Sequence, residues 1–126
     1  MDYSNGTVLA GCYAAQRQLQ FYDIKSGKKI QEIDWSGDVD DAEYLYCASY
    51  SRHDPTFFGA GSTGPHSEVR LYRESEEDAC RHNLVAQIGG LSQGCFALDF
   101  SSKMGQVAFS TPHHGLYVYE YRKTAE

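Results

Sequence analysis

The sequence predicts an all-β fold built from repeated antiparallel sheets. A four-residue segment ending in serine occurs three times, with the closing serines 47 and then 50 residues apart. An aromatic-rich run of strand length follows each copy, and the last residues of these runs are 50 and 47 apart. The copies are Met1-Asp2-Tyr3-Ser4, Ala48-Ser49-Tyr50-Ser51 and Leu98-Asp99-Phe100-Ser101, and the runs are 19–23, 69–73 and 116–120. This repeat, together with ten Tyr, six Phe and twelve Gly against three Pro, predicts stacked β-units that bury their apolar faces against one another.

The first unit, about residues 1–36, is expected to contain three strands. An apolar run is followed by a turn and a second run of β-forming residues, and Gly27 then allows a tight hairpin loop. The last run mixes polar and apolar residues, as an outer strand facing solvent does. These strands are expected at 7–13, 19–23 and 29–35. Because the first serine-ending copy starts at residue 1, the inner strand of this unit is expected to be missing.

The second unit, about 43–90, is expected to be a complete four-stranded sheet. Its third strand alternates cleanly, with Val69 and Leu71 on one face and Glu68 and Arg70 on the other. The third unit, about 94–126, ends in a short polar segment and is expected to lack its outer strand. The expected strands are 44–50, 57–61, 68–72 and 84–88, and then 96–100, 106–110 and 116–121.

The chain resembles the WD-repeat β-propeller family over essentially its whole length. Its most specific stretch ends a third strand with the aromatic-Asp pair Tyr22-Asp23 and continues into a turn that closes with Gly27-Lys28. Residues 98–101 are similar to the end of that family's innermost strand. The resemblance implies β-propeller blades, each a four-stranded antiparallel sheet.

Two motifs typical of the family are replaced in this chain. Other pairs stand where the family has Trp-Asp and Gly-His, and the family's buried Asp-His-Ser-Trp network is therefore expected to be mostly missing. Apolar packing should take its place, and the recurring tyrosines of the third strands are expected to lie in the core between blades. The replacing pairs are Tyr22-Asp23, Tyr72-Arg73 and Tyr119-Glu120 for Trp-Asp, and Gly37-Asp38 and Gly89-Gly90 for Gly-His.

The resemblance also implies that further blades complete the ring. In the family, the N-terminal strand of the domain usually joins the last blade as its outermost strand, which matches a last unit without that strand. A propeller needs about four to eight blades, so three cannot close. We therefore expect the C-terminal part of a larger, about seven-bladed propeller, with the remaining blades from the parent chain or another copy. The rival interpretation is a short protein that closes its ring by oligomerising.

Composition and charge argue against several classes of partner. A net charge of −6, a pI near 5.3 and scattered basic residues disfavour nucleic acid. No apolar run approaches the roughly 20 residues needed to cross a bilayer, and no secretory signal is visible, so no membrane partner is expected. The four cysteines match no zinc pattern. They predict reduced thiols in the cytoplasm or nucleus, with no metal and no cofactor.

The candidate site residues fall in turns that one end of the propeller should carry. His113 and His114 match His66 in the preceding unit, an acidic stretch precedes the strand at 44–50, and a basic residue lies in the first turn. The alternative to a functional site is that the histidines lie in ordinary solvent-exposed turns and that the acids form a solvent-exposed loop. The functional reading is a docking surface for a basic partner. Its residues are Arg17, Asp38, Asp40, Asp41, His66, His113 and His114, with Glu43 in the same acidic stretch.

No motif predicts catalysis. The chain has no G-x-S-x-G element, and the glycine-rich stretch 59–64 lacks the Lys of a phosphate loop. The resemblance implies a non-catalytic scaffold that binds other proteins through one face, as a subunit of a multiprotein complex. The alternative is an enzyme or small-ligand-binding propeller with a polar site at the ring axis.

Overall fold

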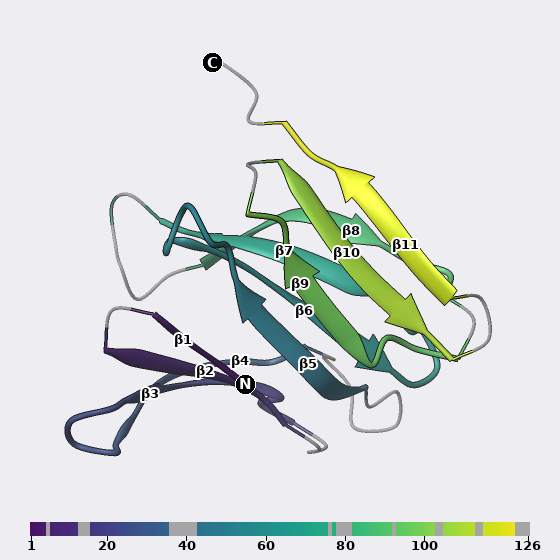
Figure 1. Ribbon diagram of the computed structural model, residues 1–126. Helices are drawn as coiled ribbons and strands as arrows, with labels where there is room; N and C mark the ends of the chain where they lie inside the picture. The colour runs from purple at the N-terminus through teal and green to yellow at the C-terminus, as the bar shows by residue number, and fades with distance from the viewer. Residues whose placement is uncertain are drawn as a thin grey trace.

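The protein is an all-β chain of eleven strands, with no helix among the residues described here (Figure 1). The computed structural model describes residues 1–4, 6–12, 16–35, 43–75, 77, 82–91, 93–102, 105–112 and 115–122. Over these ranges there is no helix long and apolar enough to span a bilayer. The predicted fold class is confirmed at the level of antiparallel β-sheets.

The strands form three antiparallel meanders, in which each strand pairs with its neighbours in sequence. The first sheet contains β1 (Asp2–Ser4), β2 (Thr7–Gly11), β3 (Leu19–Asp23) and β4 (Lys29–Ile33). The second contains β5 (Tyr44–Tyr50), β6 (Phe57–Thr63), β7 (Val69–Glu74) and β8 (His82–Ile88). The third contains β9 (Ala97–Phe100), β10 (Gln106–Thr111) and β11 (Gly115–Glu120).

The first sheet corrects the expectation of only three strands. Asp2–Ser4 forms the three-residue β1, which pairs with β2 through Asp2↔Leu9 and Ser4↔Thr7. The first serine-ending copy therefore forms a short strand, because a three-residue run opposite β2 is enough to make the ladder. The third sheet has three strands in the described part of the chain, and residues 123–126 lie outside it.

The sheets stack so that their first strands are neighbours. β5 contacts β1 and β2 of the first sheet and β9 of the third, and Figure 1 shows β1, β5 and β9 together while β11 lies at the far edge. Leu45 N–H donates to the Cys12 carbonyl at 3.3 Å, and Cys95 N–H donates to the Ser62 carbonyl at 3.1 Å. Both donors and both acceptors are 50 residues apart. The two junctions between successive sheets are thus built alike.

A glycine in the second strand of the first and second sheets allows this close approach. A Cβ on Gly11 would lie 3.0 Å from the Cβ of Leu45, and a Cβ on Gly61 would lie 2.4 Å from the sulfur of Cys95. The distance at Gly11 is tighter than nine in ten real Cβ contacts, and the distance at Gly61 is one that real Cβ atoms essentially never show. The repeat therefore preserves a glycine where each sheet meets the next.

The core consists of two apolar clusters, one at each junction. Between the first and second sheets, Phe58 stacks on Tyr72 at 5.4 Å and meets Phe21 edge-on at 5.3 Å. Each fully buried side chain of this size contributes about 1.5–3 kcal/mol. The second cluster contains Cys47, Phe57, Val69, Leu71, Cys95, Phe100, Val107 and Phe109.

The three recurring tyrosines are not equivalent in burial. Tyr72 is in the core as expected, Tyr22 is half-buried, and Tyr119 is 41% exposed. Tyr119 stacks on Phe109 at 5.5 Å, but it belongs to β11, the last strand of its sheet. The expectation of a shared core position is therefore wrong for Tyr119, because little covers that edge.

Candidate functional site

The candidate site lies at the end of the sheets where the β2–β3, β4–β5, β6–β7, β8–β9 and β10–β11 connections emerge; we call this end the loop face. A meander places alternate turns at opposite ends of a sheet. Two of these connections, β6–β7 and β8–β9, also contact each other, because Leu91 N–H donates to the Ser67 carbonyl at 3.1 Å. Of the predicted site residues, Arg17 and His66 are described and both lie on the loop face. Asp38, Asp40, Asp41, His113 and His114 lie outside the described residues.

Arg17 is an exposed cation held in place by two acidic residues. Its backbone N–H donates to Asp34 Oδ1 at 2.7 Å, and its Nε lies 3.2 Å from Glu32 Oε1. The φ of 55° places it in the left-handed region, which is uncommon for a residue other than glycine. With 63% of its side chain exposed, the ion pair contributes at most about 1 kcal/mol. Arg17 is therefore positioned by the fold and remains open to solvent.

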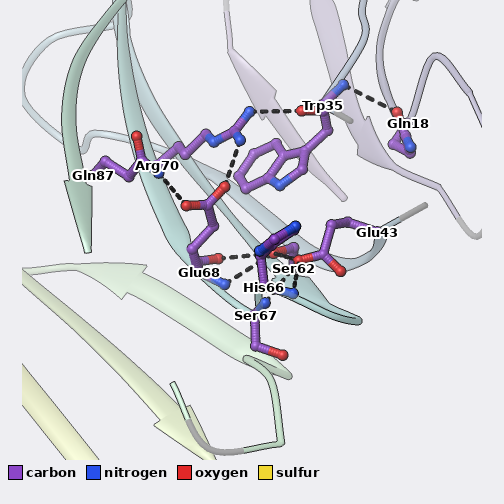
Figure 2. Close-up of polar contacts among 9 residues, drawn as sticks. All are labelled: Gln18, Trp35, Glu43, Ser62, His66, Ser67, Glu68, Arg70 and Gln87. Atoms are coloured by element: carbon purple, nitrogen blue, oxygen red, sulfur yellow. Dashed lines mark hydrogen bonds and ion pairs between the residues drawn. The ribbon is translucent and has the colours of Figure 1, made fainter. Parts of the chain in front are cut away.

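His66 is exposed at the tip of the β6–β7 turn, and a buried carboxylate fixes that turn. Glu43 is only 2% exposed. Its Oε1 accepts hydrogen bonds from His66 N–H at 2.9 Å, from Ser67 N–H at 2.7 Å and from Ser62 Oγ at 3.4 Å (Figure 2). The residue just before β5 therefore attaches the turn that carries His66 to the second sheet.

This arrangement corrects the expectation for Glu43, which is not part of a solvated acidic loop. The second sheet also contains a buried polar network of its own. Ser62 Oγ also accepts from Glu68 N–H at 3.0 Å, and it lies 3.2 Å from the Glu68 carbonyl. The available sequence signal was the position of Glu43, directly before the strand β5.

A second polar group joins the first and second sheets beneath the loop face. The buried Glu68 carboxylate pairs with Arg70 and accepts from the Gln87 amide. Arg70 Nη1 donates to the Trp35 carbonyl at 2.8 Å, and its guanidinium lies 4.4 Å from the centre of the Trp35 ring (Figure 2). Trp35 N–H in turn donates to Gln18 Oε1 at 3.0 Å. These groups are engaged with one another, so their role here is to hold the two sheets in register.

A polar cleft of about 470 Å³ lies between the first strands β1, β5 and β9. Asp2 Oδ2 accepts from Tyr50 N–H at 2.8 Å and lies 3.3 Å from Ser49 Oγ. Arg52 Nη2 contacts both carboxylate oxygens of Asp99, at 3.0 and 2.9 Å. The acids of the cleft are therefore paired with groups on β5 or just after it. Within the described ranges, no cluster of three or more His, Cys, Asp or Glu side chains could hold a metal ion.

Comparison with known proteins identifies no family. No family model matches the chain, and no curated protein matches it. The resemblance to WD-repeat propellers is therefore carried by the motifs and the period of this chain alone.

Proposed function

We propose that the three sheets are consecutive blades of a WD-repeat-type β-propeller, the C-terminal part of a ring of about seven blades. The repeated junction supports this proposal. The backbone hydrogen bond between sheets occurs twice, with both its donor and its acceptor displaced by 50 residues, and the glycine beside it is displaced by 50 residues as well. The first strands β1, β5 and β9 are neighbours, as inner strands around an axis would be.

Exposed apolar residues on the outer faces support the need for further blades. In the third sheet, Val107 and Phe109 belong to the core that faces the second sheet. Leu116 and Val118 lie on the opposite face and are 69% and 58% exposed. Covering them would remove an apolar patch that a soluble protein rarely leaves open.

The size of the chain in solution tests this part of the proposal. Light scattering after size-exclusion chromatography should give a mass above that of one chain, because separate blades from other copies would cover the open faces. A stable, well-folded monomer of 14.1 kDa would contradict both the missing-blade interpretation and its oligomeric rival.

We further propose that the protein is a non-catalytic scaffold for other proteins in a multiprotein complex of the cytoplasm or nucleus. One observation carries this proposal: Arg17 and His66 lie on turns of the loop face whose backbone is held by hydrogen bonds. The Arg17 N–H donates to Asp34, and the His66 N–H donates to Glu43. A rigid, charged rim is suited to selecting a partner by charge. We assign the preference for a basic partner to Asp38, Asp40 and Asp41, which the sequence places between β4 and β5 and which lie outside the described residues.

The alternative, an enzyme or a small-ligand site at the axis, would use the cleft between β1, β5 and β9. Asp2 there is bound to the β5 backbone, and Asp99 is bound to Arg52. Acids engaged in this way favour a structural role over catalysis.

Charge reversal distinguishes the loop face from the rest of the surface. The variant Asp40→Lys plus Asp41→Lys should lose recovery of a basic protein partner in pull-down, and the loss should be larger at low salt. The matched control is Glu76→Lys plus Glu77→Lys, two acids that are adjacent in the sequence between β7 and β8; Glu77 is exposed. Equal recovery with both variants would reject the loop face, whereas turnover of a small molecule that is lost on Asp99→Asn would favour the alternative.

A further inference from the structure

Two cysteine thiols meet in the core at the junction between the second and third sheets. Cys47 lies on β5, and Cys95 lies just before β9. Their sulfur atoms are 3.6 Å apart, and Cys47 and Cys95 are 7% and 0% exposed. Both are free thiols, and the fold alone brings together residues that are 48 apart in the sequence.

Gly61 provides the space in which the two thiols meet. A Cβ at this position would lie 2.4 Å from the sulfur of Cys95 and 2.9 Å from that of Cys47. The Cys47 sulfur also lies 3.9 Å from the Gly61 carbonyl and 3.8 Å from the Cys95 carbonyl. No side chain separates the two sulfurs.

The repeat itself does not require this pair. At the first junction, the residue that corresponds to Cys95 is Leu45, which makes the same backbone hydrogen bond. An apolar side chain therefore satisfies the packing at this position. The second junction differs by placing a thiol there, opposite a second thiol on β5.

We propose that Cys47 and Cys95 are a redox-active pair that a peroxide converts into a reversible disulfide joining the second sheet to the third. In the first step, the Cys47 thiolate attacks one oxygen of hydrogen peroxide, the O–O bond breaks, and water leaves after proton transfer. In the second step, the Cys95 sulfur attacks the resulting sulfenic acid of Cys47. The S–O bond breaks, a second water leaves and the S–S bond forms. The two thiols lose two electrons in total, and one peroxide is reduced to two waters.

The surroundings of the two sulfurs assign these roles. The hydrogen bond between the two thiols lowers the pKa of Cys47, although burial acts in the opposite direction. The same hydrogen bond, with burial, raises the pKa of Cys95. Cys47 is therefore the thiol that ionises first, and Cys95 is the resolving partner. Because both are buried, a small oxidant is the appropriate probe.

Peptide mapping of the oxidised full-length chain tests the proposal. Trypsin places the four cysteines in four different peptides, which span 1–17, 30–52, 74–81 and 82–103. The folded protein is treated with hydrogen peroxide, its remaining thiols are blocked with N-ethylmaleimide, and it is digested without reductant. We expect one dominant cross-link, between 30–52 and 82–103, with two fewer reactive thiols per chain and full reversal by dithiothreitol.

The same peroxide treatment of the chain unfolded in urea tests whether the link depends on the proximity of the two thiols in the folded protein. In the unfolded chain, links that involve Cys12 and Cys80 should compete, so the share of the 30–52 to 82–103 link should fall several-fold. Cys47→Ala and Cys95→Ala should each abolish that link in the folded protein. An equal share in folded and unfolded chains, or over-oxidation of Cys47 without any link to Cys95, would overturn the proposal.

Discussion

The buried carboxylate of Glu43 should be a main determinant of stability at the loop face. It accepts two backbone N–H bonds, at 2.9 and 2.7 Å from His66 and Ser67, and contacts Ser62 Oγ at 3.4 Å. Hydrogen bonds to a charged group are worth about 1.5–3 kcal/mol each, so Glu43→Ala removes about 3–6 kcal/mol of interaction. Relief from burying the charge offsets part of this. We expect a net loss of about 2–4 kcal/mol in the free energy of unfolding.

Glu43→Gln separates the hydrogen bonds from the charge. Its amide oxygen can still accept the two N–H bonds, but as neutral bonds worth about 0.5–1.5 kcal/mol each. The expected loss is about 1–2 kcal/mol, between wild type and Glu43→Ala. A chain of this length has about 6–19 kcal/mol of total stability, so both losses are large enough to measure.

Urea unfolding followed by tryptophan fluorescence provides the assay. Trp35 is the only tryptophan, it is buried, and its environment changes when the two sheets separate. Glu77→Ala, at an exposed glutamate in the β7–β8 connection, is the matched control and should change stability by less than about 0.5 kcal/mol. The reasoning fails if Glu43→Ala is as stable as this control, or if Glu43→Gln is less stable than Glu43→Ala.

Three further predictions concern packing and pH. Gly61→Ala should lose about 1–3 kcal/mol in urea unfolding through overpacking, because the new Cβ would lie 2.7 Å from that of Cys95; Gly89→Ala, with nothing within 4 Å, should be nearly neutral. Burial lowers the pKa of His82, so the folded state resists protonation, and Tm should fall as the pH drops below about 6.5; a His82→Phe variant whose Tm falls equally would refute this. Burial, with two nearby carboxylates, raises the pKa of Tyr50 to about 12, so stability should fall between about pH 10 and 12, and Tyr50→Phe should have a smaller loss of Tm over that range.

The sequence pattern was sufficient for every described strand except the three-residue β1, because strand identity depends on local alternation and turn residues. The period of 50 marked equivalent positions, and equivalent backbone hydrogen bonds occur there. The exposed loop-face residues Arg17 and His66 were also identifiable, since turns at one end of a meander share a side. The burial of Glu43 could not be predicted from the sequence, because it depends on a turn about twenty residues away that folds over the carboxylate. The exposure of Tyr119 likewise depends on what lies beyond β11, which local sequence does not encode.

The repeated junction has a consequence for how the chain opens. The strand β5 contacts β1 and β2 of the first sheet and β9 of the third, so cooperativity passes along a line of neighbouring sheets. Among the described sheets, the second has a neighbour on both faces, and Phe58 and Ala60 on its β6 are almost completely buried. Amide protons of β6 should therefore exchange with solvent most slowly, while the first and third sheets fray independently. A ligand that stabilises the first or the third sheet would slow amide exchange in the other only through the second sheet, β5 to β8.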